Sequence, residues 1–163
     1  MQSKNQEVSS RLSTIFDLCK QADSQQRTLG ERELQLLAQD NAYPIYLLYF
    51  LMSQNSKDFE HYLRASIEFK RWVDQNWTKP NLQDIEFSEV HIEIKKEIVK
   101  LAMALPEKIS AQLREAILTI AKYEFPSRWQ NFSSNLMSYL NPQQVEHEVN
   151  YRVWKLLGKL THK

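Results

Sequence analysis

The residues best able to carry chemistry in this sequence are its single cysteine, Cys19, and three histidines that lie in helical patterns, His61, His91 and His147. Two histidines that bind one metal ion from the same helix stand four residues apart. The residues four places after these histidines are Ala65, Lys95 and Tyr151. One cysteine cannot build a thiolate cluster either. The spacing therefore predicts no metal site.

Nucleophilic and nucleotide chemistry are equally unsupported. Cys19 sits among Phe16, Leu18 and Ala22, a pattern that indicates a half-buried helical position with nothing to lower its pKa. A phosphate-binding loop needs several glycines so that backbone N–H groups can approach the ligand. The only two glycines, Gly30 and Gly158, are isolated inside helical patterns. We therefore predict no catalytic residue, no cofactor and no enzyme activity.

Length and composition indicate an ordinary folded domain. The chain has 163 residues, of which 42% are hydrophobic, and its net charge is +1. The charges are evenly spread, so a general attraction to nucleic acid or to a membrane surface is not expected. The most apolar run, Tyr43–Met52, is far shorter than the roughly 18 residues of a membrane span. The lone cysteine and the polar N-terminus predict a soluble intracellular protein.

Apolar residues recur at steps of three and four along most of the chain, which predicts helices and no strand. The predicted helices cover about 6–19, 24–39, 43–54, 59–77, 89–104, 110–123, 126–140 and from Asn141 past Trp154. Asp23 and Asn141 are predicted N-caps, and Pro126 is placed at a first helical position. Thr78–Ser88 is the one long predicted loop. Four basic residues near the end, Arg152, Lys155, Lys159 and Lys163, are expected to interact with a helix dipole.

Successive helix pairs begin near residues 6, 43, 88 and 126, a repeat of about 40 residues that is typical of HEAT-like solenoids. The predicted fold is all-α: a right-handed α-α superhelix of about four antiparallel pairs. We expect a single domain over 1–163 with repeats at 6–40, 43–79, 88–124 and 126–163. A single irregular helical bundle is the alternative. In either case "EFPSRW" is a corner, with Phe125 and Trp129 filling the seam between neighbouring repeats.

Three segments resemble the N-terminal region of importin-β superfamily nuclear transport receptors. The first repeat of that family carries Arg-x-x-Ala-Glu-x-x-Leu, which is matched here by Arg27, Gly30, Glu31 and Leu34, with Gly for Ala. The second is matched by Arg64, Ser66, Phe69, Lys70, Arg71 and Trp77, with Arg71 for the usual Asn. The third is matched by Gln112, Leu113, Ala116, Ile117, Phe125, Pro126 and Trp129.

Within that superfamily, "IKKEIV", "LPEKISAQLREAI" and "FPSRW" are most similar to the CAS-type exportins, which return importin-α to the cytoplasm. The resemblance implies that the second helices of the pairs bind the small GTPase Ran in its GTP form. It also implies shuttling between nucleus and cytoplasm, with the nuclear envelope as a further location, and importin-α or other cargo in a full-length protein. Family members are several times longer, so we expect either an N-terminal fragment or a receptor without most of its cargo arch.

Matching to the family motifs nominates six residues for contact with Ran: Glu31, Arg64, Lys70, Asp74, Gln112 and Glu115. Lys70 is the foremost candidate, because an ammonium there can meet a carboxylate on the GTPase. Two structural alternatives stay open, namely that Glu31 bonds within its own repeat and that Arg64 braces the neighbouring helix pair. Phe69 and Trp129 are expected in the core. The rival function is a generic HEAT-type scaffold that binds another protein partner.

Overall fold

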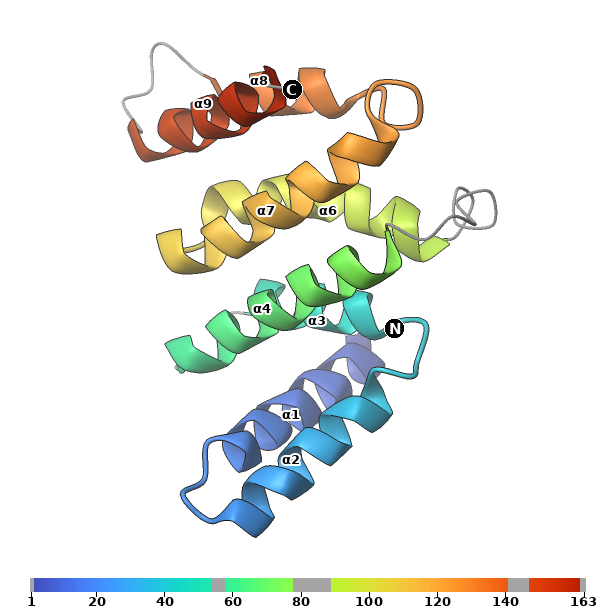
Figure 1. The fold of residues 1–163 in the computed structure, drawn as a ribbon, viewed down its shortest axis with the longest axis vertical. Helices are drawn as coiled ribbons and strands as arrows, with labels where there is room; N and C mark the ends of the chain where they lie inside the picture. Colours follow the sequence, from blue (N-terminus) through green and yellow to red (C-terminus); the bar gives the residue numbers. More distant parts are fainter. Residues whose placement is uncertain (1, 54–57, 78–88, 141–146, 162–163) are drawn as a thin grey trace. The chain divides into compact units, whose positions relative to one another are not determined.

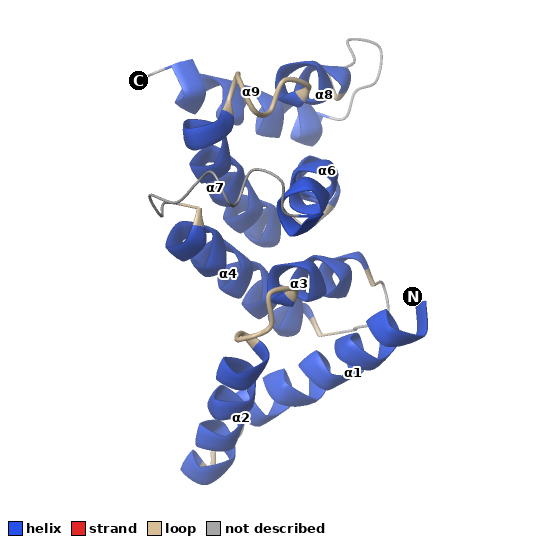
Figure 2. Ribbon diagram, turned by 90° about the vertical axis from the view of Figure 1, so that its right-hand side faces the viewer, coloured by secondary structure: helices blue, strands red, loops and turns tan. Residues whose placement is uncertain are grey.

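The computed structural model describes residues 2–53, 58–77, 89–140 and 147–161. Within these ranges the chain forms eight α-helices and no strand (Figures 1 and 2). They are α1 (Gln2–Cys19), α2 (Ser24–Leu37), α3 (Tyr43–Met52), α4 (Phe59–Asn76), α6 (Glu89–Ala104), α7 (Glu107–Glu124), α8 (Phe132–Ser138) and α9 (His147–Thr161). None of these helices is long and apolar enough to cross a membrane. The predicted loop Thr78–Ser88 and the predicted cap at Asn141 lie outside the described residues.

The chain divides into two compact units, residues 1–69 and 70–163. In the first unit, α1 and α2 form a helix pair, and α3 packs against α1 (Figure 1). Aromatic rings from α1, α3 and α4 pack together in this unit: Phe50 meets Phe16 edge-on at 5.6 Å between ring centroids and Tyr62 at 5.4 Å. Asp23 begins α2 as predicted, since its side chain accepts a hydrogen bond from the Gln25 backbone N–H at 2.8 Å.

Gly30 is required by the close approach of α2 to α1. A Cβ atom at this position would lie 2.7 Å from the backbone nitrogen of Cys19 and 2.9 Å from Leu18 Cβ. Real Cβ atoms do not come so close to backbone, so an alanine would force the helices apart. This contact explains why Gly30 stands where the family motif has alanine.

In the second unit, α6 and α7 form a helix pair joined through Pro106, and α9 packs against both. The helix α7 begins at Glu107, three residues before the predicted start at Ser110. The Pro106 carbonyl accepts hydrogen bonds from the N–H groups of Ile109 at 3.0 Å and Ser110 at 2.8 Å, which extends the first turn toward the proline. Proline lacks an N–H and suits such a position.

The corner after α7 differs from the prediction of a helix starting at Pro126. Residues 125–131 form turns, and α8 begins only at Phe132. Phe125 is extended, the conformation that a following proline favours. Trp129 is 3% exposed and stacks on Phe132 at 4.3 Å, which confirms its predicted core position. Phe125 is 39% exposed, so the expectation that it fills a seam was wrong.

A buried polar cluster joins the end of α4 to the rest of the second unit. Glu124, which is 2% exposed, accepts hydrogen bonds from Trp77 Nε1 at 2.9 Å and from Lys95 Nζ at 2.6 Å. The ring of His91 lies 4.4 Å from that of Trp77 and 6.0 Å from that of Trp72. Neither His91 nitrogen has a hydrogen-bond partner in the described part of the chain, and burial lowers the pKa of His91 to about 4.

Candidate partner-binding surface

The six nominated residues lie on the three helices that the sequence predicted to be the second of their pairs. Glu31 lies on α2, while Arg64, Lys70 and Asp74 lie on α4, and Gln112 and Glu115 lie on α7. Arg64 and Glu31 belong to the first unit, and the other four belong to the second.

In the first unit, Glu31 and Arg64 bind each other. Arg64 Nη2 lies 3.0 Å from both carboxylate oxygens of Glu31, and its Nε donates to Glu68 Oε1 at 2.9 Å. Glu68 is buried, whereas the other two side chains are half-exposed. Arg64 thus links α4 to α2, which agrees with the alternative that Arg64 braces the neighbouring helix pair. A partner that contacts this pair has to share it or replace it.

Glu68 is a further neighbour of Arg64 that the family motifs did not point to. It stands four residues after Arg64 on the same helix face, a spacing at which opposite charges pair. Glu31 and Arg64 are also close to Cys19. Burial and then the nearby carboxylate of Glu31 raise the pKa of the Cys19 thiol. The thiolate form is therefore disfavoured, as the sequence predicted for this residue.

In the second unit, Lys70 and Asp74 form a pair that extends to α7. Lys70 Nζ lies 3.3 Å from Asp74 Oδ2, and Thr119 Oγ1 lies 3.1 Å from Asp74 Oδ1. The side chains of Lys70 and Asp74 are 35% and 44% exposed. Thr119 was not nominated, although it stands four residues after Glu115 on the same helical stripe and donates to the Glu115 carbonyl.

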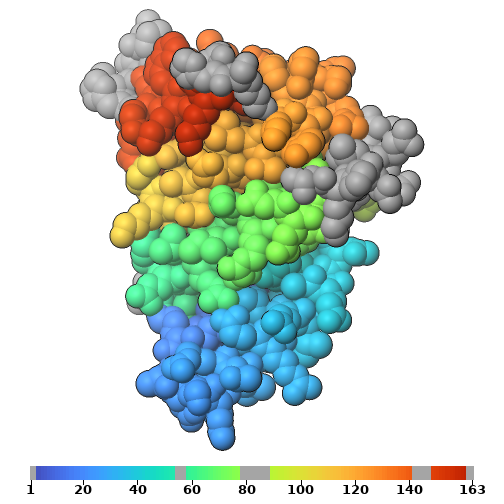
Figure 3. Space-filling model, in the orientation of Figure 1, coloured from blue at the N-terminus to red at the C-terminus, as the bar shows by residue number. Residues whose placement is uncertain are grey.

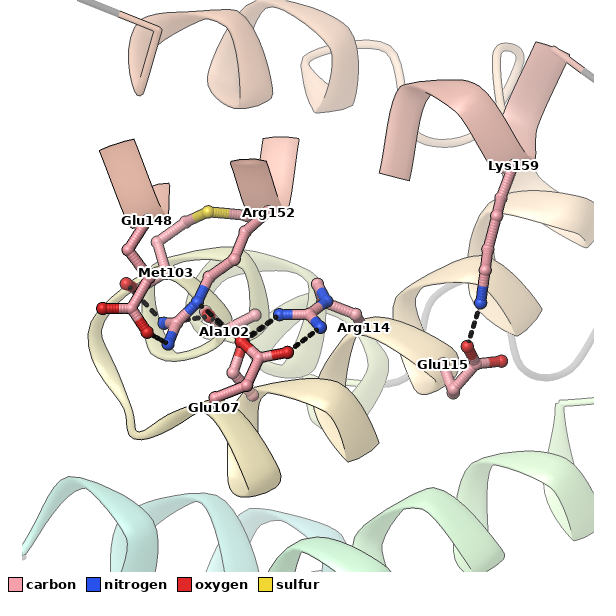
Figure 4. A network of polar contacts seen from close by, with 9 residues as sticks. Ala102, Met103, Glu107, Arg114, Glu115, Glu148, Arg152 and Lys159 are labelled. Carbon is pink, nitrogen blue, oxygen red and sulfur yellow. Dashed lines mark hydrogen bonds and ion pairs between the residues drawn. The ribbon is translucent and has the colours of Figure 1, made fainter. Parts of the chain in front are cut away.

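Glu115 is bound by a cation from the last helix. Lys159 Nζ forms an ion pair with Glu115 Oε1, and both side chains are about half exposed (Figure 4). The surfaces of α7 (gold) and α9 (red) adjoin in Figure 3. Gln112 is half-buried on α7, three residues before Glu115. The structure therefore brings Lys159 to this surface, which pattern matching did not anticipate.

A buried guanidinium cluster fixes α9 on α6 and α7, and thereby positions Lys159 (Figure 4). Arg152 Nη1 donates to the carbonyls of Ala102 at 3.1 Å and Met103 at 2.9 Å, close to the C-terminal end of α6. Its Nη2 donates to Glu148 at 2.6 Å, and its Nε lies 3.4 Å from Glu107. Cations are favoured at helix C-termini. Arg152 thus meets the dipole of α6, which lies far from it in the sequence.

Glu107 also pairs with a second buried arginine. Arg114 Nη2 lies 2.7 Å from Glu107 Oε1, and its Nη1 donates to Ser110 Oγ at 2.8 Å. The hydrogen bond from Arg114 lowers the pKa of the Glu107 carboxyl, with Arg152 adding to the effect. One carboxylate thus serves two guanidinium groups that are both at most 5% exposed.

Comparison with known proteins shows what this arrangement is similar to. No protein-family model matches the chain. The importin alpha re-exporter of Saccharomyces cerevisiae is 32% identical over 112 residues, which are 69% of this chain and 12% of that protein. The importin-alpha re-exporter of Schizosaccharomyces pombe is also 32% identical, over 68% of this chain and 12% of its own length. Exportin-2 of Homo sapiens is 29% identical over 69% of this chain and 11% of its own length.

A solved structure agrees with these relatives. The exportin Cse1 in its cargo-free, cytoplasmic state matches 96% of this chain with a TM-score of 0.74 and 25% sequence identity. The matched part is 16% of that exportin, and the chain spans about one-eighth of the length of the yeast proteins. The match confirms the all-α, HEAT-like fold class. The chain is related to the exportins named importin-α re-exporter and exportin-2, as the resemblance of its motifs to CAS-type exportins predicted.

Proposed function

We propose that this chain is the N-terminal arm of a nuclear transport receptor, that it binds Ran in its GTP form, and that it takes part in the export of importin-α. The observation that carries the proposal is the similarity to exportins, which covers 69% of the chain in the sequence of the Saccharomyces cerevisiae relative and 96% of the chain in the structure of Cse1, at a TM-score of 0.74. The receptor would shuttle between nucleus and cytoplasm. Its importin-α cargo would be held with parts of the protein beyond this chain.

The charges on the second helices support a protein partner. Lys70 with Asp74 and Lys159 with Glu115 offer both signs of charge on half-exposed side chains. Such groups can exchange an internal ion pair for one across an interface at small cost, because exposed pairs are worth only about 0.2–1 kcal/mol. Complementary charge then sets the association rate and the choice of partner more than the affinity itself.

The test of the proposal is the nucleotide dependence of Ran binding. The whole chain is immobilised, and Ran loaded with a non-hydrolysable GTP analogue or with GDP is passed over it in biolayer interferometry. Preferential binding of the GTP form is expected. Equal binding of both forms, or binding of neither, would favour the rival reading of a HEAT-type scaffold with another partner.

A charge reversal at Lys70 tests the site separately. Lys70→Glu should weaken the complex with GTP-loaded Ran by about tenfold, or roughly 1.4 kcal/mol, because it replaces a cation of the surface by a carboxylate. Lys100→Glu lies on α6, the first helix of the α6–α7 pair. It makes the same charge change at an exposed position and serves as the control. Both variants should keep the helix content of the parent in far-UV circular dichroism. If Ran binds both variants equally, Lys70 does not belong to the interface.

A further inference from the structure

Three side chains of the first unit converge at the junction of α1 and α4. Asp17 lies near the end of α1, Asp58 directly precedes α4, and His61 lies in the first turn of α4. His61 Nε2 is 3.0 Å from Asp17 Oδ1 and 3.4 Å from Asp58 Oδ2. All three donor atoms lie within 4.8 Å of one another. This is the one group of metal-ligating side chains of this size in the described part of the chain.

His61 is buried and directed into this cluster. Its side chain is only 4% exposed, and Ser13 Oγ lies 3.4 Å from its Nδ1. Despite the two nearby carboxylates, Nε2 makes no hydrogen bond of acceptable geometry within the described residues. A proton on Nδ1, donated to Ser13, leaves the Nε2 lone pair facing carboxylate oxygens. A bound cation removes that repulsion, and a hydrogen-bonded second nitrogen is the usual support of a metal-binding histidine.

The charges around His61 also fit a divalent cation. Asp17, Asp58 and Glu60 bring three carboxylates, and Lys20 brings one ammonium, 2.7 Å from Asp58 and 2.9 Å from Glu60. With a neutral imidazole the group therefore keeps two negative charges. One divalent ion would balance them.

The spacing of the donor atoms matches a tetrahedral ion with short bonds. Zinc binds imidazole nitrogen and carboxylate oxygen at about 2.0–2.2 Å, which places neighbouring ligands about 3.3–3.5 Å apart. The distances of 3.0 and 3.4 Å from His61 Nε2 need only small adjustments to reach this arrangement. Nitrogen and oxygen donors together suit zinc better than the oxygen-only preference of calcium or magnesium.

We propose that Asp17, Asp58 and His61 bind one zinc ion, with water as its fourth ligand. The ion would link the end of α1 to the start of α4 and so stabilise the first unit. Because the ligands come from two helices and the residue before the second one, a search for two histidines on one helix could not find the site. The inference is independent of any binding to Ran.

The experiment uses the whole, tag-free chain after treatment with a chelator. It is titrated with zinc chloride in a non-coordinating buffer, and the heat of binding is measured by isothermal titration calorimetry. Binding of one zinc ion per chain is expected, and zinc should also raise the midpoint temperature of thermal unfolding. Asp17→Asn should weaken that binding by at least about tenfold, since even an outer-shell contact is worth 10–100-fold in metal affinity. The Asp17 side chain is 62% exposed, so the variant should fold normally.

Glu60→Gln is the matched control, because it removes one negative charge from the same group without removing a proposed ligand. Its zinc affinity should fall by less than about fivefold. The proposal is overturned if the parent chain shows no saturable zinc binding, or if Asp17→Asn and Glu60→Gln bind zinc as well as the parent does. Equal losses in the two variants would also overturn it, since they would show a general attraction of charge and no coordination by Asp17.

Discussion

His91 should make the stability of the protein depend on pH. Its ring is 7% exposed, lies against Trp77, and has no hydrogen-bond partner in the described part of the chain. Burial lowers the pKa of His91 from 6.5 to about 4. Between these two values the unfolded chain binds a proton that the folded chain does not, so stability is present in full above pH 6.5 and is lost as the pH falls toward 4.

The size of the effect follows from the two pKa values of His91. One pKa unit corresponds to about 1.4 kcal/mol, so the full loss is about 3 kcal/mol. About 2 kcal/mol of it should be lost between pH 7 and pH 5, where most carboxyl groups are still ionised. That is a large share of the 5–15 kcal/mol by which domains are usually stable.

The assay is urea unfolding at pH 7, 6 and 5, followed by circular dichroism at 222 nm. The parent chain is compared with His91→Phe, which keeps a flat ring beside Trp77 and cannot be protonated. The difference between the two proteins isolates the contribution of His91 from that of the other histidines. The variant should lose about 2 kcal/mol less than the parent between pH 7 and pH 5. Parallel losses in both proteins would refute the reasoning, because they would place the titrating group elsewhere.

Two further predictions concern packing and charge. Gly30→Ala should destabilise the chain by about 1–3 kcal/mol in urea unfolding, because the new Cβ meets the backbone of Cys19. Gly158→Ala places its Cβ in open space and should stabilise α9 by up to about 1 kcal/mol. Similar effects of the two changes would contradict the close approach of α1 and α2. Glu124→Gln should cost about 2–3 kcal/mol at pH 7, because it leaves the ammonium of Lys95 without its buried partner. Unfolding of that variant at an unchanged urea concentration would show that the pair adds nothing.

Local pattern was enough to place most of the helices. The start of α2 follows from the side chain of Asp23, and the extent of α6 from apolar spacing, because both depend on neighbours within one or two turns. The start of α8 could not be predicted in this way. A proline can begin a helix or open a turn, and at Pro126 the outcome is a turn whose Trp129 packs on Phe132. The same turn is held by Lys95 of α6, whose ammonium donates to the Arg128 carbonyl at 3.2 Å, and local spacing does not encode this tertiary contact.

Among the residues nominated for partner binding, contacts within one helix could likewise be predicted from the sequence, whereas contacts between helices could not. The pair of Lys70 and Asp74 can be read from the sequence, because residues four apart on a helix are neighbours. The partners of Glu31 and Glu115 stand 33 and 44 residues away, and no local spacing encodes such distances. Motif matching therefore found the helices that carry charge. It could not show that Glu31 and Glu115 already bind cations of other helices.

The hydrogen bonds from Arg152 to the carbonyls of Ala102 and Met103 have a consequence for the folding of the chain during synthesis and for its truncation. During synthesis, α6 and α7 emerge well before α9. The Ala102 carbonyl can then accept a hydrogen bond from the Ser110 hydroxyl of α7, whereas the Met103 carbonyl lacks the hydrogen bond from Arg152 until α9 follows. Arg152 stands 50 and 49 residues after the two carbonyls that it binds, so these hydrogen bonds form only after α9 has been made. A truncation ahead of residue 147 would therefore remove the contacts of Arg152 with the Met103 carbonyl and with Glu107.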